Sequence, residues 1–376
     1  MRIIWRYSRR RRLQKDRGRS DTPMAPTQAD IAKACGVSYT TVSFVLNDKA
    51  REMNISAAVI DKVKAAARRM GYTRNYHAAT LATGKSHAIG LVIYSDLINP
   101  YWSTITEGID KAAQQNRYDV LLMTDGPDER MPAKCLRFFR ERRIDGMIVV
   151  GGYREYTIKA AQEQGFPLVA IEVTPKGLCP EIKFDSLPGI EAAVRHLYEK
   201  GHRHVLWVGL RRPDGTVVLP PRRERFHDTI RQLSMSAHEM ILTQETAPGD
   251  YAGLLQMAYA QLSRRLTIDK KTTAVMCHND IVALALNHVL AQRGVRVPGD
   301  LSLIGFDDLQ AAYCVPALTT ISHRLDEMGR RAAQVLLGLI KDRGADVPPA
   351  CDPVVHAELV IRDSVAAVKT RRKAPA

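Results

Sequence analysis

The fold of this chain is decided between residues 26 and 47, where the sequence reads PTQADIAKACGVSYTTVSFVLN. Thr27 and Asp30 have the spacing of a capping box at the start of a short helix, and Gly36 stands where a left-handed residue ends one. Ser38 predicts the start of a second helix. The apolar residues recur at the spacing of two helices that pack against each other: Ile31, Ala34 and Cys35, then Val42, Val45 and Leu46.

The second predicted helix has a polar outer face, formed by Tyr39, Thr40 and Ser43, with Phe44 beside them. A helix of this size fits the major groove of DNA, where such side chains reach base edges. The same pattern also suits an ordinary amphipathic helix pair, so these two helices alone leave both interpretations open. A third helix is predicted over residues 56–70, with an apolar side formed by Ile60, Val63, Ala67 and Met70.

The net charge of +15 is unevenly distributed along the 376 residues. Residues 1–23 carry nine Lys or Arg and two Asp, and residues 24–87 carry nine basic and four acidic residues. The tail at residues 369–373 adds four positive charges, which leaves residues 88–368 with a net charge of −1. Positive charge therefore belongs to the chain ends and the helical segment, where DNA phosphates would be contacted.

Composition excludes several classes of protein. No apolar run approaches the roughly 20 residues of a membrane span, and the N-terminus lacks the apolar region of a signal peptide. The six cysteines are scattered without a Cys-x-x-Cys pair, which argues against a zinc site and a disulfide framework. We therefore expect a cytoplasmic protein with no metal and no cofactor.

From residue 88 the pattern changes to apolar strands that alternate with amphipathic helices. A first series has expected strands at 89–94, 120–124, 147–150 and 168–171, and a second has them at 204–208, 240–243 and 274–277. Such spacing predicts parallel sheets covered by helices on both faces, in two doubly wound subdomains. Ligands of such sheets bind beyond the carboxyl ends of the strands, so polar residues just after each strand are the candidates for a site.

The chain resembles the lactose and purine repressor (LacI-GalR) family over most of its length. The resemblance rests on the segment from Val37 to Asn47, on Gly71-Tyr72, and on four stretches of the large part: NPYW at 99–102, RRIDGMIV at 142–149, GHRHV at 201–205, and VPGDLSLIGFDD at 297–308 followed by PALTTI at 316–321. It implies an all-α helix-turn-helix DNA-binding domain and an α/β periplasmic-binding-protein-like core of two parallel-sheet subdomains.

This resemblance implies a division of the chain into five parts. Residues 1–23 are a basic extension, interpreted either as a disordered arm or, with more weight, as the result of a start codon placed ahead of a natural start at Met24. The DNA-binding domain is expected at 24–74, a hinge at 75–87, the effector-binding and dimerisation core at 88–366, and a basic tail at 367–376.

The resemblance also implies which residues contact DNA. Leu81 occupies the position of the family's hinge leucine, which wedges into the minor groove and kinks the site. Ala79 stands where the family often has a basic residue, so hinge contacts to phosphates should be weaker. The full set of expected DNA-contacting residues is Thr27, Ser38, Tyr39, Thr40, Thr41, Ser43, Phe44, Asn47, Tyr72 and Leu81.

Effector contacts of the family align with Tyr101, Trp102, Glu172, Arg222, Asn279 and Asp307. These side chains suit a polyhydroxylated ligand, because carboxylates and an amide bond hydroxyls, an arginine bonds two oxygens, and an aromatic ring stacks on a sugar face. Each also has a structural interpretation: the acids can pair with basic neighbours, and Trp102 can belong to the core. The register of the arginine stays open because Arg223 and Arg225 lie close by.

Together these features predict a sequence-specific transcription regulator, and in particular a repressor, that binds a palindromic DNA operator as a homodimer. A small ligand in the cleft, a sugar or sugar derivative, is expected to switch it. Two alternatives stay open: a ligand-binding sensor without specific DNA binding, and a regulator with a purine-like effector. Enzymatic phosphate-loop, serine hydrolase and zinc protease motifs are absent from the sequence, so no enzyme activity is expected.

Overall fold

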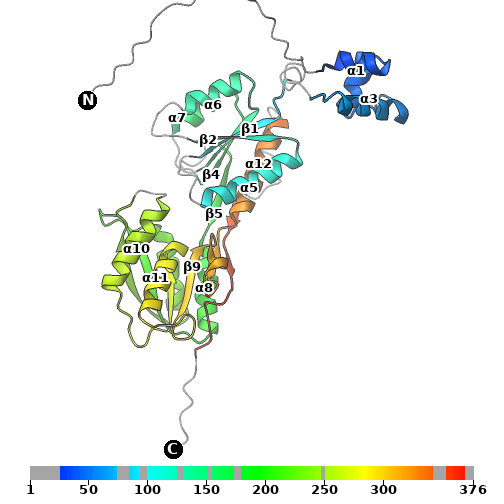
Figure 1. The fold of residues 1–376 in the computed structure, drawn as a ribbon. Coiled ribbons are helices and arrows are strands. Elements are labelled where there is room, and N and C mark those ends of the chain that lie inside the picture. Colours follow the sequence, from blue (N-terminus) through cyan, green and yellow to red (C-terminus); the bar gives the residue numbers. More distant parts are fainter. Residues whose placement is uncertain are drawn as a thin grey trace, which may run out of the picture. The chain divides into compact units, whose positions relative to one another are not determined.

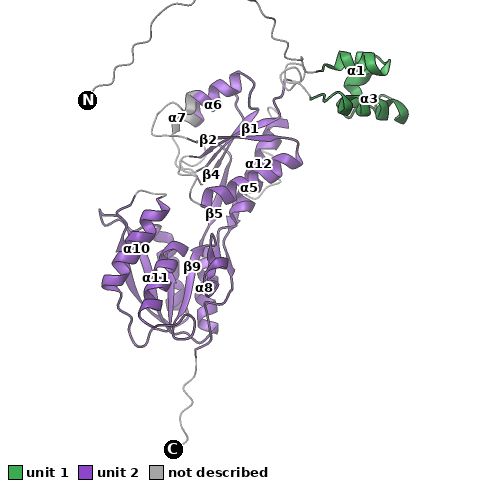
Figure 2. Ribbon diagram, viewed as in Figure 1, with its two compact units in different colours: residues 1–79 green, residues 80–376 purple. Residues whose placement is uncertain are grey.

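The computed structural model describes residues 26–73, 84–93, 100–124, 131–150, 155–172, 179–246, 250–341 and 353–368. The chain forms two compact units, residues 1–79 and 80–376 (Figure 2). Unit 1 is helical, and unit 2 contains two sheets with helices around them (Figure 1). The basic extension at 1–23, the hinge residue Leu81 and the end of the tail at 369–376 lie outside the described residues.

Unit 1 contains α1 (Gln28–Cys35), α2 (Tyr39–Leu46) and α3 (Ala57–Arg69). The predicted capping box is confirmed: the Thr27 amide donates to Asp30 Oδ2 at 2.8 Å, and the Asp30 amide donates to Thr27 Oγ1 at 3.3 Å. Gly36 ends α1 with a φ of 63°, as expected for a left-handed cap. Ser38 caps α2 through the Thr41 amide at 3.0 Å.

One apolar cluster holds these three helices together. Its buried members come from all three helices and include Ile31, Cys35, Val42, Val45 and Val63. The prediction for Ala34 is wrong, because this residue is exposed and Ala32 is buried instead. Alanine is compatible with both the buried and the exposed face of a helix, so the sequence pattern does not decide between Ala32 and Ala34.

The first sheet of unit 2 has the strand order β11-β5-β4-β3-β1-β2, and its paired neighbours are parallel. Helices α5 and α12 pack on one face with Ile89, Leu91 and Ile93, while α6 packs on the other face with Val92. The elements are β1 (Ala88–Ile93), α5 (Pro100–Gln115), β2 (Asp119–Thr124), α6 (Met131–Arg140), β3 (Gly146–Val150), α7 (Glu155–Glu163), β4 (Leu168–Ile171), β5 (Glu181–Asp185), α12 (Leu325–Lys341) and β11 (Val354–His356).

The second sheet has the order β12-β10-β9-β8-β6-β7, with only the β10–β12 pair antiparallel among its described strands. Helices α8 and α9 cover one face, and α10 and α11 cover the other. The elements are α8 (Leu187–Glu199), β6 (His204–Arg211), α9 (Pro220–Gln232), β7 (Ser236–Thr243), α10 (Tyr251–Arg265), β8 (Ala274–Cys277), α11 (Asp280–Gln292), β9 (Ser302–Asp307), the short 3-10 helix η1 (Ala311–Tyr313), β10 (Thr319–Ser322) and β12 (Glu358–Val360).

The prediction of two doubly wound subdomains is confirmed, and β4 and β8 have the predicted bounds. The chain order was predicted incompletely. After β10 the chain returns to the first sheet, where α12 covers one face and β11 forms an edge strand, before β12 joins the second sheet. The first sheet therefore combines the start of the core sequence with β11 near its end, and the second sheet combines the middle of the core sequence with β12.

Close packing of α5 on α12 yields a prediction for stability. A Cβ added at Gly108 would lie 2.0 Å from the backbone oxygen of Asp326. We expect Gly108→Ala to lower the free energy of unfolding by about 1–3 kcal/mol, because backbone must move to admit the methyl group. A urea titration measures this loss. Gly299→Ala is the matched control, since its new methyl meets Arg296 no closer than 3.5 Å. Equal stability of G108A and the wild type would contradict the packing.

Candidate functional site

Residues at the carboxyl ends of strands line one cavity in unit 2, with a volume of about 630 Å³. Tyr101 contributes from the start of α5, which follows β1 in the chain, while His278 and Asn279 follow β8 and Asp307 ends β9. Parallel strands present such residues on one edge of their sheet, which is where ligands of doubly wound folds bind. Three of the six predicted effector residues, Tyr101, Asn279 and Asp307, therefore line the same cavity.

Tyr101 links this cavity to the first sheet. Its hydroxyl donates to Glu172 Oε2 at 2.6 Å, and Glu172 directly follows β4. Burial, reinforced by the negative charge of Glu172, raises the pKa of Tyr101 well above its ordinary value. The phenol therefore keeps its proton and acts as a fixed donor at neutral pH.

A buried histidine joins the next residues of the site. His323 Nε2 lies 2.9 Å from Asp307 Oδ1 and 3.3 Å from Arg222 Nη2. Its ring stacks on Phe184 with a centroid distance of 4.0 Å and meets Tyr101 edge-on at 5.3 Å. Burial, aided by the nearby Arg222 guanidinium, lowers the pKa of His323 to about 3, so the imidazole is neutral. The neutral ring of His323 thus connects Tyr101 and Phe184 of the first subdomain with Arg222 and Asp307 of the second.

Burial raises the pKa of Asp307 to about 7, while the positive charge of Arg222 acts in the opposite direction. The backbone is also strained here, since φ is 111° at Asp307 and 50° at Glu172. Such values are costly for residues with a Cβ and concentrate at functional sites. Asp307 lines the cavity, and Glu172 accepts from the Tyr101 hydroxyl of the lining, so the strained backbone at both residues supports a role in binding rather than in folding.

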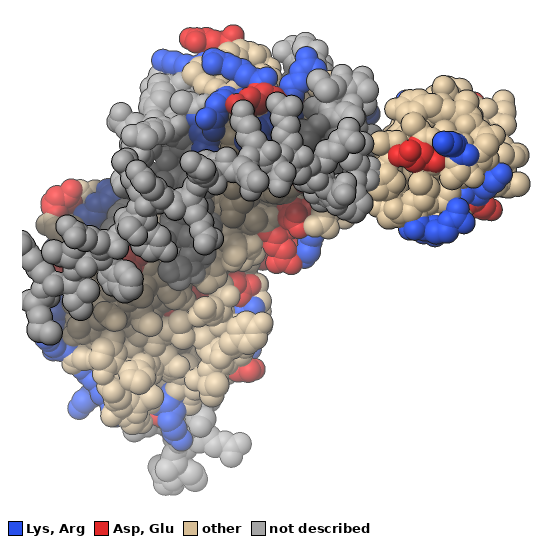
Figure 3. All heavy atoms as spheres, turned by 45° about the horizontal axis from the view of Figure 1, so that its top comes forward, with Lys and Arg blue, Asp and Glu red and all other residues tan. Residues whose placement is uncertain are grey.

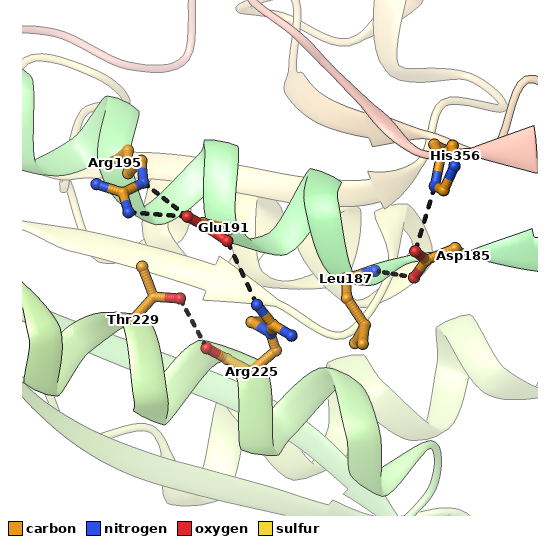
Figure 4. Close-up of polar contacts among 7 residues, drawn as sticks. All are labelled: Asp185, Leu187, Glu191, Arg195, Arg225, Thr229 and His356. Atoms are coloured by element: carbon orange, nitrogen blue, oxygen red, sulfur yellow. Dashed lines mark hydrogen bonds and ion pairs between the residues drawn. The ribbon is translucent and has the colours of Figure 1, made fainter.

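The structure resolves the register of the arginines on α9. Arg222 is buried at 7% exposure, and its guanidinium lies 3.7 Å from the centroid of the Phe306 ring, beside the cavity. Arg223 instead pairs with Glu239 at 2.7 Å. Arg225 turns to α8, where it contacts Glu191 at 3.3 Å (Figure 4), and it is not among the residues that line the cavity. Arg222 is therefore the arginine that the fold directs to this site.

Two predicted residues have structural contacts as well. Trp102 packs against the core of the first sheet, with its ring 4.7 Å from Tyr101 in an edge contact. Its Nε1 is buried without a hydrogen-bond partner among the described residues. Asn279 lines the cavity but also caps α11, since its Oδ1 accepts from the Val282 amide at 3.0 Å.

Sequence reasoning missed His323 and His278. Both follow strands, β10 and β8, at the same carboxyl edge as the predicted residues. The rule that selected Glu172 and Asp307 would have selected them too. The sequence Thr-Thr-Ile-Ser of β10 contains no apolar run, so the pattern does not predict this strand and does not mark His323 as a residue at a strand end.

The polar lining of the cavity, taken as a whole, has more acidic than basic side chains. Glu245, Asp250 and Asp307 face it, with Arg212 as the cation of the lining. Burial lowers the pKa of His278 to about 3, so this side chain adds no charge. Hydroxyl and amide groups complete the polar wall, namely Tyr101, Gln244, Thr246, Tyr251 and Asn279.

In unit 1, several predicted DNA-contacting residues already have partners. Thr27 and Ser38 cap helices, and the Tyr72 hydroxyl accepts from Gln28 Nε2 at 3.1 Å. Asn47 Nδ2 donates to Ser43 Oγ at 3.2 Å, and the hydroxyls of Ser38 and Thr41 lie 2.8 Å apart. Tyr39, which is 60% exposed, and Thr40 are exposed on α2, and Phe44 is half-buried outside the core cluster of unit 1.

Family comparisons agree with both units. Residues 27–75 match the bacterial regulatory proteins of the lacI family, and residues 194–365 match a periplasmic binding protein-like domain. The chain belongs to the LacI family. As a member of this family it is a DNA-binding transcription regulator.

Curated relatives span almost the whole chain. The HTH-type transcriptional repressor CytR of Escherichia coli K12 is 28% identical over 347 residues, which cover 92% of this chain and 97% of CytR. The repressor PurR of Haemophilus influenzae Rd is 28% identical over 351 residues, with 91% and 99% covered. These LacI family relatives are transcriptional repressors, not enzymes.

Solved structures show the same fold. The lac repressor dimer bound to operator and the anti-inducer ONPF has a TM-score of 0.67 and 24% identity, with 91% of this chain and 99% of that chain covered. A LacI family regulator from Enterococcus faecium with bound ribose has a TM-score of 0.59 and 24% identity, with 75% and 100% covered. At this identity the likeness establishes the architecture of both units and leaves the ligand of this chain open.

The described residues contain neither a helix suited to span a membrane nor a cluster suited to hold a metal. No helix in the described ranges combines the length and apolar character needed to cross a bilayer. Within those same ranges, no group of three or more His, Cys, Asp or Glu side chains is arranged to hold a metal ion.

Proposed function

We propose that this LacI family member is a repressor that binds a two-fold symmetric operator as a homodimer and is controlled by a neutral sugar or sugar derivative. The observation that carries the proposal is the convergence of Tyr101, Glu172, Arg222 and Asp307 around His323 beside the cavity. In this proposal, the helices of unit 1 bind DNA and the cavity of unit 2 binds the ligand. A regulator with these two parts couples them when the ligand prefers one arrangement of the core.

The chemistry of the cavity supports a neutral polyhydroxylated ligand. Carboxylates accept hydrogen bonds from hydroxyl groups, and the Tyr101 and Tyr251 rings offer apolar faces to the rest of a sugar ring. The lining carries Glu245, Asp250 and Asp307 against Arg212, with Arg222 buried beside it, and this excess of acidic groups disfavours phosphorylated or carboxylated ligands. We assign effector binding to Tyr101, Trp102, Glu172, Arg222, Asn279 and Asp307, with His323 as an added positioning residue.

An exposed apolar patch supports the homodimer. Tyr313 is 88% exposed and Val315 is 89% exposed, which is unusual for large apolar side chains. Leu284 of α11 and Cys314 lie at the same place, since they line small hollows together with Tyr313 and Pro316. We assign this patch, formed by Leu284, Tyr313, Cys314, Val315 and Pro316, to the dimer interface, where a second copy would cover it in a self-complementary contact.

Base contacts are assigned to α2 and its neighbours, with Leu81 as the proposed minor-groove residue of the hinge. Phosphate and base-edge contacts together would come from Thr27, Ser38, Tyr39, Thr40, Thr41, Ser43, Phe44, Asn47 and Tyr72. Two exposed members of this set, Tyr39 and Thr40, stand in the first turn of α2, where recognition helices contact bases.

Phe44 gives a direct test of which face of α2 meets DNA. Its ring offers only an apolar contact, such as that with a thymine methyl group, whereas arginine bonds guanine through two nitrogens. We expect Phe44→Arg to shift the preferred base at one position of each half-site towards guanine, by about 1–3 kcal/mol. Selection from a random duplex pool measures the preference of both proteins. An unchanged site would show that Phe44 does not face the groove.

The whole proposal is tested by selecting duplexes with protein that starts at Met24, followed by a panel of sugars, sugar phosphates and purines on the selected site. We expect a two-fold symmetric site whose affinity changes with one neutral sugar. Enrichment of no sequence at moderate salt, with a sugar still bound by unit 2, would replace the proposal with a ligand sensor that has no specific DNA target. A response to purines alone would overturn the ligand assignment.

A further inference from the structure

The strand-start edge of the first sheet is positively charged. This edge is formed by the loops at residues 84–87, 116–119 and 141–145, and the last turn of α6 adjoins it. The loops lie side by side: the Asp119 amide donates to the His87 carbonyl at 2.9 Å, and the Asp145 amide donates to the Ala88 carbonyl at 2.8 Å. The basic residues of this edge are Lys85, Arg117, Arg137, Arg140, Arg142 and Arg143.

Acidic residues offset only part of this charge. Asp145 is buried at 3% exposure, and its carboxylate accepts from the Ser86 and His87 amides at 2.8 and 3.0 Å, so it does not face the solvent. Glu141 pairs with Arg137 at 3.7 Å and with Arg143 at 3.9 Å. Asp119 and Glu163 are the other exposed acids near these loops. The exposed side chains therefore leave an excess of positive charge at this edge.

The arginines are held outward by their packing. The Arg143 guanidinium lies 3.9 Å from the centroid of the Phe138 ring, and that of Arg137 lies 5.5 Å away on the same ring. Their side chains remain 51% and 61% exposed. Lys and Arg side chains gather over the end of unit 2 that carries α6 (Figure 3). A guanidinium supported on an aromatic ring stays available to bond a phosphate.

This edge is also where the chain enters unit 2 from the DNA-binding unit. The Arg142 guanidinium lies beside Gly84, since a Cβ added there would be 3.5 Å from its Nη1. Eleven residue steps separate Thr73, at the end of the described part of unit 1, from Gly84. At about 3.6 Å a step, an extended chain spans at most about 40 Å. Gly84, at the basic edge, is therefore tethered within that distance of Thr73.

We propose that this basic edge, formed by Arg137, Arg140 and Arg142 with their neighbours, binds the phosphate backbone of double-stranded DNA beside the operator. The inference rests on the proposed operator binding by unit 1. Opposite charge and the short tether identify the partner: polyanionic duplex is the ligand that unit 1 brings to this surface. The contact lengthens the DNA footprint beyond the bases read by α2 and adds affinity without sequence preference.

The experiment compares two duplexes, the selected site with blunt ends and the same site with 15 base pairs of unrelated sequence on each side. Binding is measured by fluorescence anisotropy from 50 to 300 mM salt for the wild type and for the triple variant Arg137→Gln, Arg140→Gln, Arg142→Gln. We expect the wild type to bind the longer duplex about tenfold more tightly and the variant to lose that gain. The salt slope on the longer duplex should fall by about 0.9 for each lost phosphate contact.

The matched control removes three exposed arginines of the second subdomain with Arg231→Gln, Arg264→Gln and Arg265→Gln. An equal loss in this control, or wild-type affinity of the first variant for both duplexes, would overturn the proposal. Urea midpoints and the sugar response of each variant show that the core is intact. The ratio of selected to scrambled sequence at one length tests operator binding separately, so a failed operator cannot be mistaken for a failed flank contact.

Discussion

Asp307→Asn is expected to weaken effector binding about 100-fold at pH 8, and to abolish the effector response of DNA binding at ordinary ligand concentrations. The carboxylate of Asp307 faces the cavity from the end of β9, with His323 on its other side. A hydrogen bond to a charged group contributes about 1.5–3 kcal/mol. An amide keeps the size of the side chain but turns one acceptor into a donor, so ligand hydroxyls lose a partner. Titration calorimetry with the effector measures the loss.

The same carboxylate predicts how effector binding depends on pH. Burial raises the pKa of Asp307 to about 7, and the ionised form is the one that accepts hydrogen bonds from ligand hydroxyls. Effector affinity should therefore be full above pH 7 and fall as the pH drops through 7, where protons compete for the carboxylate. His278 and His323 have pKa values lowered to about 3 by burial, so they stay neutral throughout this range.

Asp280 is the other buried acid whose titration approaches this range. Burial, with the charges of Asp307 and Asp308, raises the pKa of Asp280 to about 8, and its carboxylate accepts from Thr320 Oγ1 at 2.6 Å. In Asp307→Asn the fall of affinity near pH 7 should disappear. Because this substitution also removes a charge that helps to raise the pKa of Asp280, any remaining transition in the variant belongs to Asp280 and should vanish when Asp280→Asn is added. Persistence of a pH 7 transition in this double variant would refute the assignment to Asp307.

Asp308→Asn is the matched control for Asp307→Asn. Asp308 is the next residue in the chain, but its carboxylate pairs with Arg362 at 2.7 Å. This variant should therefore keep effector affinity within about threefold, since a partly exposed ion pair contributes about 1 kcal/mol or less. Equal losses in both variants would show that the effect comes from the loop as a whole and not from the carboxylate of Asp307.

Strands of the core could be predicted closely because both faces of each sheet are covered. Ala274 to Cys277 and Leu168 to Ile171 are short, continuously apolar runs between polar segments, and such runs have few other stable placements. The helix caps of α1 could be predicted equally well, since Thr27 and Gly36 act on neighbouring residues and their roles do not depend on the rest of the fold.

The packing of elements far apart in the chain could not be predicted from such local patterns. The pattern of α12 shows that the helix has an apolar face, but it does not show that this face covers the first sheet beside α5. Prediction of the site residues was incomplete for the same reason, because long-range packing decides some of them. Strand ends pointed to Asp307 and Glu172, whereas the choice of Arg222 over Arg225 depends on how α9 turns against α8. His323 was missed because β10 is made of buried threonines whose hydroxyls bond Asp280 and the C-terminal segment.

Tyr313→Glu combined with Val315→Glu is expected to dissociate the dimer and to reduce operator affinity at least 100-fold. The two side chains are almost fully exposed in the described structure and belong to the patch assigned to the dimer interface. Burial of carboxylates in a contact between copies is strongly unfavourable, and the two-fold symmetry of the contact would bury the introduced charges of both copies. Two linked half-site contacts exceed a single one by about 10²–10⁴ in affinity, so their separation removes that advantage.

Sedimentation velocity measures the dimer, and fluorescence anisotropy compares the full operator with a single half-site. The variant should bind both duplexes with similar, weak affinity while keeping the base preference of its half-site, because unit 1 has its own core. Effector affinity should be unchanged. Tyr198→Glu, on the exposed side of α8 away from the patch, is the control and should remain dimeric. A double variant that stays dimeric would place the interface elsewhere, and one that keeps full operator affinity as a monomer would show that the operator is bound by a single copy.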